Sequence, residues 1–225
     1  MQDRLEDREY SRFRKGMGGY SLCERCNNLT GAWYGKAFVQ WTKQGFDWID
    51  KLQTTPIISL PYYIQPLNVL KQVLSMALAM SAEASIPYHR ELRQFVLINR
   101  MRHLPPRYRV HVYFNPNGQP RFASGMAITK IGDDGGSNYV EAEIALPPFG
   151  YCVTTPVGNY RSLAESTGLY EMTWFSSYSY NEWANIHLRI PLRETHESFP
   201  LDYRSKSEVA AHKDRLKKNS PLLSK

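Results

Sequence analysis

A change in hydrophobic pattern at Pro105-Pro106 divides the chain into two parts with different expected secondary structure. Before these prolines, apolar residues recur at steps of three and four, which is typical of amphipathic helices. After them, apolar and polar residues alternate over short segments bounded by turn residues, which is typical of strands. The sequence therefore predicts an α+β fold, with a helical middle followed by a mostly antiparallel sheet.

Three helices are expected before these prolines. The first covers residues 30–53, with Thr30 as its N-cap and three tryptophans on the face toward the core. The second starts at Pro66, continues to residue 83 and is apolar enough for the centre of the core. A proline-containing segment at 56–66 is expected to be an extended connection or an edge strand. The third helix covers residues 91–103, and its inward-facing residues are expected to be Phe95, Val96, Ile98 and Met101.

Six segments after the prolines are expected to be strands. Asn115-Pro116-Asn117-Gly118 is a strong turn signal, so the strand at 121–128 is expected to return as the partner of the strand at 107–114. The expected strands are 107–114, 121–128, 139–146, 151–155, 169–175 and 183–190.

The net charge of +7 is concentrated in two places. The segment from Arg204 to Lys225 has seven Lys or Arg and two Asp or Glu, a net +5, so the rest of the chain carries only +2. The segment from His89 to His111 has six arginines and one acid, Glu91. These arginines are candidates for binding nucleic-acid phosphates, or they belong to a solvated helix face followed by an exposed strand start. They are Arg90, Arg93, Arg100, Arg102, Arg107 and Arg109.

The sequence also bears on the compartment. There is no run of about 18 apolar residues, so no membrane span is expected. The N-terminal residues are charged and lack an apolar stretch, so no secretory signal peptide is expected. Three cysteines, two of them close together, do not resemble a secreted disulfide framework. These observations predict a soluble, cytoplasmic protein.

Cys23 and Cys26 form a Cys-x-x-Cys pair, which has three common meanings. A redox pair sits at a helix N-terminus, although a thioredoxin-like site needs a preceding βαβ pattern and too few residues precede Cys23. Half of a tetrahedral zinc site needs two more thiolates or imidazoles. The third meaning is two ordinary cysteines near a turn. The remaining candidate ligands, none of which forms a second closely spaced pair, are Cys152, His89, His103, His111, His187, His196 and His212.

The pair belongs to a longer motif, Leu22-Cys23-Glu24-Arg25-Cys26-Asn27-Asn28-Leu29-Thr30-Gly31, followed by an aromatic helix. This motif resembles the second zinc half of HNH-type endonucleases, in which Leu-Cys-x-x-Cys-(His/Asn) opens the last helix of a treble-clef finger. The extended pattern Cys-Asn-Asn-x-Thr-Gly-x-Trp-Tyr-Gly is similar to that of bacterial and phage proteins of this family. The resemblance covers Leu22 to Gly35 and implies a DNA-directed role in phage or mobile-element biology.

The resemblance implies roles for three residues. Cys23 and Cys26 match zinc ligands, and Asn27 matches the final His/Asn of the signature, which helps to hold the catalytic metal or orient the site. The family places another Cys-x-x-Cys and the general-base His upstream, and positions 1–22 contain neither Cys nor His. Hydrolysis of this kind needs both a base and a metal. The chain is therefore expected to be a truncated or catalytically degenerate member that acts on or binds DNA.

Each metal that the resemblance implies would need ligands in addition to Cys23 and Cys26. Zinc at Cys23 and Cys26 would be structural with an incomplete ligand set, and a catalytic divalent metal would require the upstream half of the motif. Two ligands alone do not hold structural zinc, but a second copy of the chain would bring another pair and complete a four-thiolate site in a homodimer.

One alternative is a non-catalytic α+β module that binds nucleic acid or protein and has a vestigial Cys pair. Strand aromatics would then stack on single-stranded bases, or they are ordinary strand residues. These aromatics are Tyr108, Tyr113, Phe114, Phe122 and Tyr139.

Another alternative is an enzyme built on the C-terminal half. Glu141 and Glu143 are two residues apart on one strand and suit acid–base pairing, although their alternation with apolar residues is more typical of a solvent face. Cys152 is expected to be buried and inert, and His187 to be a strand residue on one face of the sheet.

Four regions are expected in all. They are a charged arm with the Cys-x-x-Cys half finger at 1–31, a helical region at 32–104, an antiparallel β region at 105–203 and a basic tail at 204–225. Ser205 and Glu208 form a capping-box pattern, which predicts a short helix in the tail.

Overall fold

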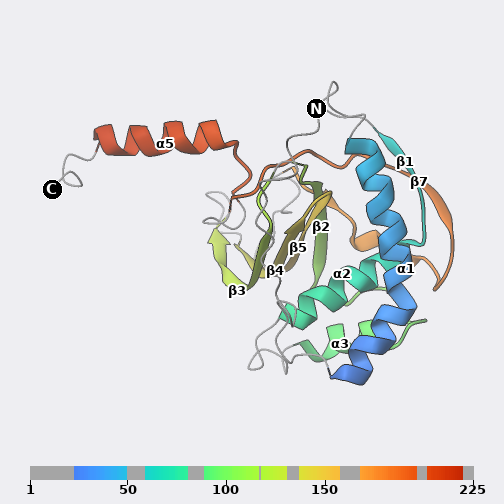
Figure 1. Ribbon diagram of the computed structural model, residues 1–225. Coiled ribbons are helices and arrows are strands. Elements are labelled where there is room, and N and C mark those ends of the chain that lie inside the picture. Colours follow the sequence, from blue (N-terminus) through green and yellow to red (C-terminus); the bar gives the residue numbers. More distant parts are fainter. Residues whose placement is uncertain are drawn as a thin grey trace.

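Helices and antiparallel sheets occur together in the protein, so the α+β prediction is confirmed. In the computed structural model, helices α1 and α2 lie on one side of a five-stranded sheet (Figure 1). Within the described part of the chain, no helix is long and apolar enough to cross a membrane. The structure describes residues 23–49, 59–80, 89–116, 118–130, 137–157, 168–196 and 202–219.

Helix α1 (Glu24–Ile49) begins earlier than predicted, so the assignment of Thr30 as its N-cap is wrong. The Asn27 N–H already donates to the Cys23 carbonyl, at 2.9 Å. Thr30 is buried within the helix, where its Oγ1 donates to the Asn27 carbonyl over 3.1 Å. The predicted end of this helix, at residue 53, lies outside the described residues.

Helix α2 (Pro66–Met80) starts at the predicted proline, and most of its side chains are buried. Its predicted last residues, 81–83, are not among those described. Helix α3 (Arg90–Leu97) ends well before Pro105-Pro106. Ile98 is consequently 53% exposed instead of facing the core. Lys71 of α2 explains the early end, because its Nζ donates to the carbonyls of Ile98 and Asn99 at 2.6 and 3.1 Å.

The larger sheet has the strand order β3-β4-β5-β2-β6, with every pair antiparallel. Its strands are β2 (Arg109–Phe114), β3 (Arg121–Lys130), β4 (Ser137–Leu146), β5 (Phe149–Val157) and β6 (Tyr170–Glu171). The predicted hairpin between the segments 107–114 and 121–128 is therefore wrong, because β2 pairs with β5 and β6 while β3 pairs with β4.

The residues after β2 have partners that prevent a hairpin. The Asn115 N–H donates to the Pro148 carbonyl (2.8 Å), and the Asn115 Oδ1 accepts from the Thr195 hydroxyl (3.2 Å). The Gln119 N–H donates to the Thr195 carbonyl at 2.9 Å. The turn signal is local, whereas these bonds connect Asn115 and Gln119 to distant parts of the chain.

The predicted strand at 169–175 is only partly a strand. β6 contains two residues, and a 3₁₀ helix, η3 (Thr173–Ser177), follows it. The predicted strand at 183–190 forms β7 (Ala184–Leu188), which pairs with β1 (Leu60–Ile64) in a separate two-stranded sheet. This pairing confirms an edge strand in the segment 56–66.

The core between α1 and the larger sheet centres on Trp41. Its ring stacks on Phe149 of β5 with centroids 4.5 Å apart, and its Nε1 donates to the Tyr151 hydroxyl at 2.8 Å. Trp33 and Trp48 are partly buried against the same core. The prediction that the three tryptophans are core residues is confirmed.

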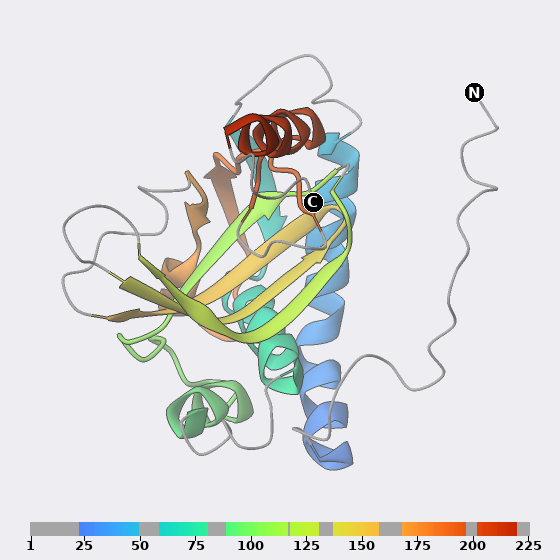
Figure 2. The ribbon, with the colours of Figure 1, turned by 90° about the vertical axis from the view of Figure 1, so that its left-hand side faces the viewer.

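Helix α5 (Lys206–Asn219) extends away from the rest of the molecule in Figure 1 and is seen nearly end-on in Figure 2. The predicted capping box is present at its start. The Ser205 N–H donates to Glu208 Oε2 (2.7 Å), and the Glu208 N–H donates to Ser205 Oγ (3.3 Å). The bonds to Ser205 hold the pKa of the Glu208 carboxyl below its ordinary value.

Candidate functional site

Cys23 and Cys26 lie together at the amino end of α1. Their Sγ atoms are 2.9 Å apart, and the Cys26 N–H donates to Cys23 Sγ over 3.3 Å. Cys23 thus occupies the N-cap position, which sequence reasoning missed because cysteine is not among the usual capping residues. The Cys23 thiol is exposed and that of Cys26 is half-buried.

The two thiols have opposite tendencies to ionise. The hydrogen bonds from the Cys26 thiol and the Cys26 N–H hold the pKa of Cys23 below its ordinary value. The hydrogen bond to Cys23 and partial burial raise the pKa of Cys26. Arg93 on α3 is close enough to Cys26 to oppose part of this rise. Cys23 therefore loses its proton more readily than Cys26.

The described residues do not complete a structural zinc site around the pair. Among the described residues, no group of three or more His, Cys, Asp or Glu side chains is placed to hold a metal ion. Cys152 and the described histidines therefore supply no third or fourth ligand to Cys23 and Cys26, and the side chain of His212 is not described. Asn27, matched to the HNH signature, is exposed in the first turn of α1.

The six arginines predicted to bind nucleic acid do not behave alike. Arg107 pairs with Glu91, with Nε and Oε2 3.3 Å apart. Arg109 pairs with Glu171, with Nε and Oε1 3.5 Å apart. The carboxylates offset the charge of these two arginines, which makes both poorer phosphate ligands.

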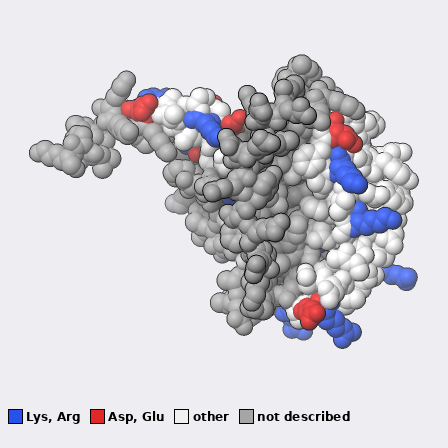
Figure 3. All heavy atoms as spheres, viewed as in Figure 1, with Lys and Arg blue, Asp and Glu red and all other residues white. Residues whose placement is uncertain are grey.

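The other four arginines form what we call the arginine surface: Arg90, Arg93, Arg100 and Arg102. Within the described part of the chain, none of them forms a salt bridge. Arg90, Arg100 and Arg102 are exposed, and Arg93 is half-buried. Figure 3 shows Lys and Arg side chains at the lower edge of the molecule, where α1 begins and α3 lies.

Two shallow hollows belong to this surface. The first, of about 250 Å³, is lined by Arg90, Arg93, Gln94, Leu97 and Ile98. The second, of about 440 Å³, is lined by Arg100, Arg102, Ser179, Tyr180 and Asn181.

The arrangement of the first hollow follows from the sequence of α3. Leu92, Phe95 and Val96 are buried, which turns position 90 toward the opposite face and leaves half-buried Arg93, one helical turn further on, at the border between the two faces. In the second hollow, an Arg102 guanidinium N–H donates to the Ser177 carbonyl.

Lys71 supports the segment between the two hollows. Its ammonium group is buried, donates to the Ile98 and Asn99 carbonyls, and lies 4.5 Å from the centre of the Phe95 ring. Burial lowers the pKa of Lys71 to about 7. Sequence reasoning missed this residue, although Lys71 is the only charged residue of a largely apolar helix, which was the available signal.

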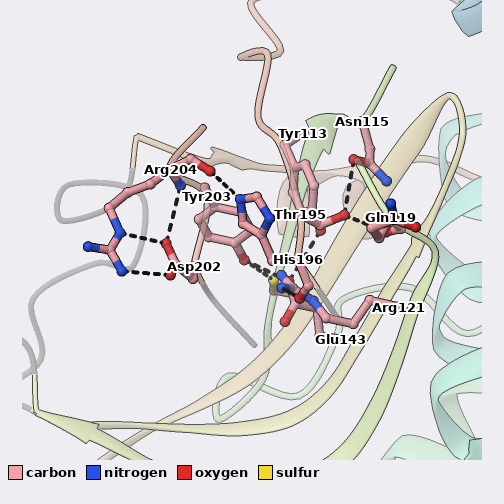
Figure 4. A network of polar contacts seen from close by, with 11 residues as sticks. Tyr113, Asn115, Gln119, Arg121, Glu143, Thr195, His196, Asp202, Tyr203 and Arg204 are labelled. Carbon is pink, nitrogen blue, oxygen red and sulfur yellow. Dashed lines mark hydrogen bonds and ion pairs between the residues drawn. The ribbon is translucent and has the colours of Figure 1, made fainter. Parts of the chain in front are cut away.

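A buried polar network lies on the face of the larger sheet opposite α1 and α2 (Figure 4). Arg121 of β3 forms an ion pair with Glu143 of β4, and both side chains are almost completely buried. Glu143 Oε1 also accepts from the hydroxyls of Tyr113 (3.2 Å) and Tyr203 (3.0 Å). Cys152 Sγ lies 3.0 Å from the Tyr203 hydroxyl.

The interpretation of Glu143 as a solvent-face residue is therefore wrong. A register shift between Val140 and Ala142 interrupts the alternation of β4, and the segment that carries Tyr203 covers this face. The side chain of Glu141, the predicted partner of Glu143, is not described. Arg121 neutralises Glu143, which argues against an acid–base pair.

The other candidates in the C-terminal half are structural. Cys152 is fully buried as predicted, and burial raises the pKa of its thiol well above the ordinary range. Burial likewise raises the pKa of the Tyr113 and Tyr203 hydroxyls. His187 is an exposed residue of β7, in agreement with its prediction as a strand residue.

Of the two interpretations of the strand aromatics, burial supports ordinary strand packing and not stacking on bases for Tyr108, Tyr113 and Phe114, which are at most 1% exposed. Phe122 is partly buried against the core, and the side chain of Tyr139 is not described. Tyr113 and Phe114 lie on opposite faces of β2 and are both buried, because both faces of this strand are covered. The alternating pattern alone suggested a face open to solvent.

No protein-family model matches the chain, and neither a curated protein nor a solved structure does.

Proposed function

We propose that the protein binds nucleic acid through the arginine surface and that this binding does not depend on cleavage. The observation that carries the proposal is that exposed Arg90 and half-buried Arg93 of α3 line one hollow and have no carboxylate partner among the described residues. Guanidinium groups bind phosphate oxygens in a bidentate manner, so arginines that are free of carboxylates are suited to a phosphate backbone.

The distribution of charge supports the same proposal. Arg107 and Arg109 have acidic partners, whereas the four residues of the arginine surface lie in or beside hollows that a phosphate group can enter. Lys71 holds the Ile98–Asn99 backbone between the two hollows, which reduces the conformational freedom lost on binding. Such contacts favour sequence-independent recognition, since phosphate contacts carry no base information.

The resemblance to HNH-type endonucleases supports nucleic acid as the class of ligand. The match at Cys23, Cys26 and Asn27 lies at the amino end of α1, and Cys26 is electrostatically coupled to Arg93. We limit the proposal to binding because the described residues do not complete the ligand set that the family uses.

Binding to a fluorescein-labelled duplex and to a single strand, followed by anisotropy at low salt, tests the proposal. Arg90→Gln and Arg93→Gln should each weaken binding to both nucleic acids. Arg189→Gln is the matched control, because Arg189 is an exposed arginine outside the arginine surface. Equal losses in all three variants would indicate a general charge effect, and no binding by the wild-type protein would refute the proposal.

A further inference from the structure

The Cys23–Cys26 pair has the geometry of a dithiol that is ready to oxidise. A disulfide needs an S–S distance of about 2.0 Å and Cα atoms about 4.4–6.8 Å apart. The two Sγ atoms are already 2.9 Å apart, and residues three apart at a helix end lie within the required Cα range. Only a small rotation of the side chains separates the dithiol from the disulfide.

The surroundings of the pair favour attack by Cys23. The Cys23 thiol is exposed at the N-cap of α1, so a partner molecule can reach it. The Cys26 N–H points at Cys23 Sγ and is one of the helix donors that lack a partner within the helix. Cys26 is half-buried behind it, where it is in contact with Cys23 and protected from a second partner.

We propose that Cys23 and Cys26 form a thiol–disulfide exchange site whose substrates are disulfides. The Cys23 thiolate attacks one sulfur of the partner disulfide, forming a mixed disulfide and releasing the other sulfur as a thiolate. Cys26 then loses its proton to solvent and attacks Cys23 Sγ, which forms the Cys23–Cys26 bond and releases the second partner thiolate. The pair is oxidised by two electrons, and the partner disulfide is reduced to two thiols.

The third cysteine provides an internal contrast. Cys152 is completely buried between β2, β4 and the segment carrying Tyr203, so no partner disulfide reaches its sulfur. It should remain a thiol under conditions that oxidise the pair. This inference concerns the thiols alone and does not rest on nucleic-acid binding.

The test equilibrates the full chain with mixtures of reduced and oxidised glutathione, quenches the exchange with acid, labels all free thiols with N-ethylmaleimide in denaturant so that buried Cys152 also reacts, and locates the labels by mass spectrometry. The wild-type protein should lose both labels at Cys23 and Cys26 together as oxidised glutathione increases, and keep the label at Cys152. Cys152→Ser should behave in the same way. Far-UV circular dichroism confirms that each variant is folded.

The two single variants make the test specific for exchange. In Cys26→Ser the second step is absent, so Cys23 should accumulate as a stable mixed disulfide with glutathione. In Cys23→Ser, far less mixed disulfide with glutathione should form at the half-buried Cys26. Equal accumulation at the two positions would overturn the assignment of the attacking thiol.

Two further outcomes would overturn the proposal itself. One is full labelling of both cysteines in excess oxidised glutathione. The other is zinc that co-purifies at one ion per two chains and prevents labelling until a chelator is added, because the thiols would then be metal ligands between two copies of the chain.

Discussion

Gly45 of α1 lies directly against the ring of Phe149 of β5. A Cβ atom at position 45 would lie 2.5 Å from ring carbons Cε2 and Cζ, and 2.8 Å from Pro148 Cγ. This contact sets the distance between α1 and the larger sheet. It also allows Trp41, one helical turn before Gly45, to stack on the same ring. A glycine that lowers intrinsic helix stability is therefore required by the packing.

The Gly45→Ala variant should be less stable than the wild type by about 1–3 kcal/mol, because the clash outweighs the gain in helix propensity. Gly35→Ala is the matched control in the same helix, since a Cβ there meets nothing within 4 Å. That variant should gain up to about 1 kcal/mol. Urea denaturation measures both, and a stabilised Gly45→Ala protein would show that α1 does not pack this closely on the sheet.

Removing one partner of the buried Arg121–Glu143 pair should have a large effect. Glu143→Gln leaves the Arg121 charge buried without its carboxylate and should cost about 3–5 kcal/mol of unfolding free energy. Arg204→Gln removes the pair that Arg204, at the surface, forms with Asp202 and should have a much smaller effect. Similar losses in the two variants would mean that Arg121 and Glu143 are hydrated in solution.

His111 should make the protein sensitive to acid. Its ring is buried on β2, opposite Cys152 of β5 and Glu171 of β6. Burial, with a smaller effect of the Arg109 charge, lowers its pKa from 6.5 to about 4. The unfolded chain therefore takes up a proton below pH 6.5, whereas the folded protein does so only near pH 4.

The stability contributed by neutral His111 is complete above pH 6.5 and should decline by about 3 kcal/mol as the pH falls to 4. His111→Gln should remove this part of the pH dependence, whatever its effect on stability at pH 7. Urea denaturation at pH 7 and at pH 4.5 measures the difference. An NMR titration of His111 with a pKa near 6.5 in the folded protein would contradict the prediction.

Periodicity in the sequence predicted where the chain is helical or extended, but not how its segments pair. The prolines and the apolar spacing correctly placed α2 at Pro66 and the tryptophans in the core. The turn signal at 115–118 failed because Asn115 and Gln119 bond to Pro148 and Thr195, which are distant in the sequence. Such tertiary contacts override local turn chemistry and leave no local trace.

For the candidate site, too, the sequence identified the residues but not their contacts. The spacing of Cys23 and Cys26 identified the pair, but only the structure shows that Cys23 caps α1 and that the two sulfurs touch. The six arginines were visible as a group, while the partners of Arg107 and Arg109 depend on the folding of α3 and β6 beside them. Charge counts do not reveal which cations are already neutralised.

The dependence of nucleic-acid affinity on salt is the sharpest test of phosphate binding at the arginine surface. Each phosphate contact that is lost should reduce the slope of log K against log salt by about 0.9 on duplex DNA. We expect that combining Arg90→Gln with Arg93→Gln lowers the magnitude of this slope by about 2, while Arg189→Gln leaves it unchanged. An unchanged slope in the double variant would contradict the assignment of the arginine surface as the binding site.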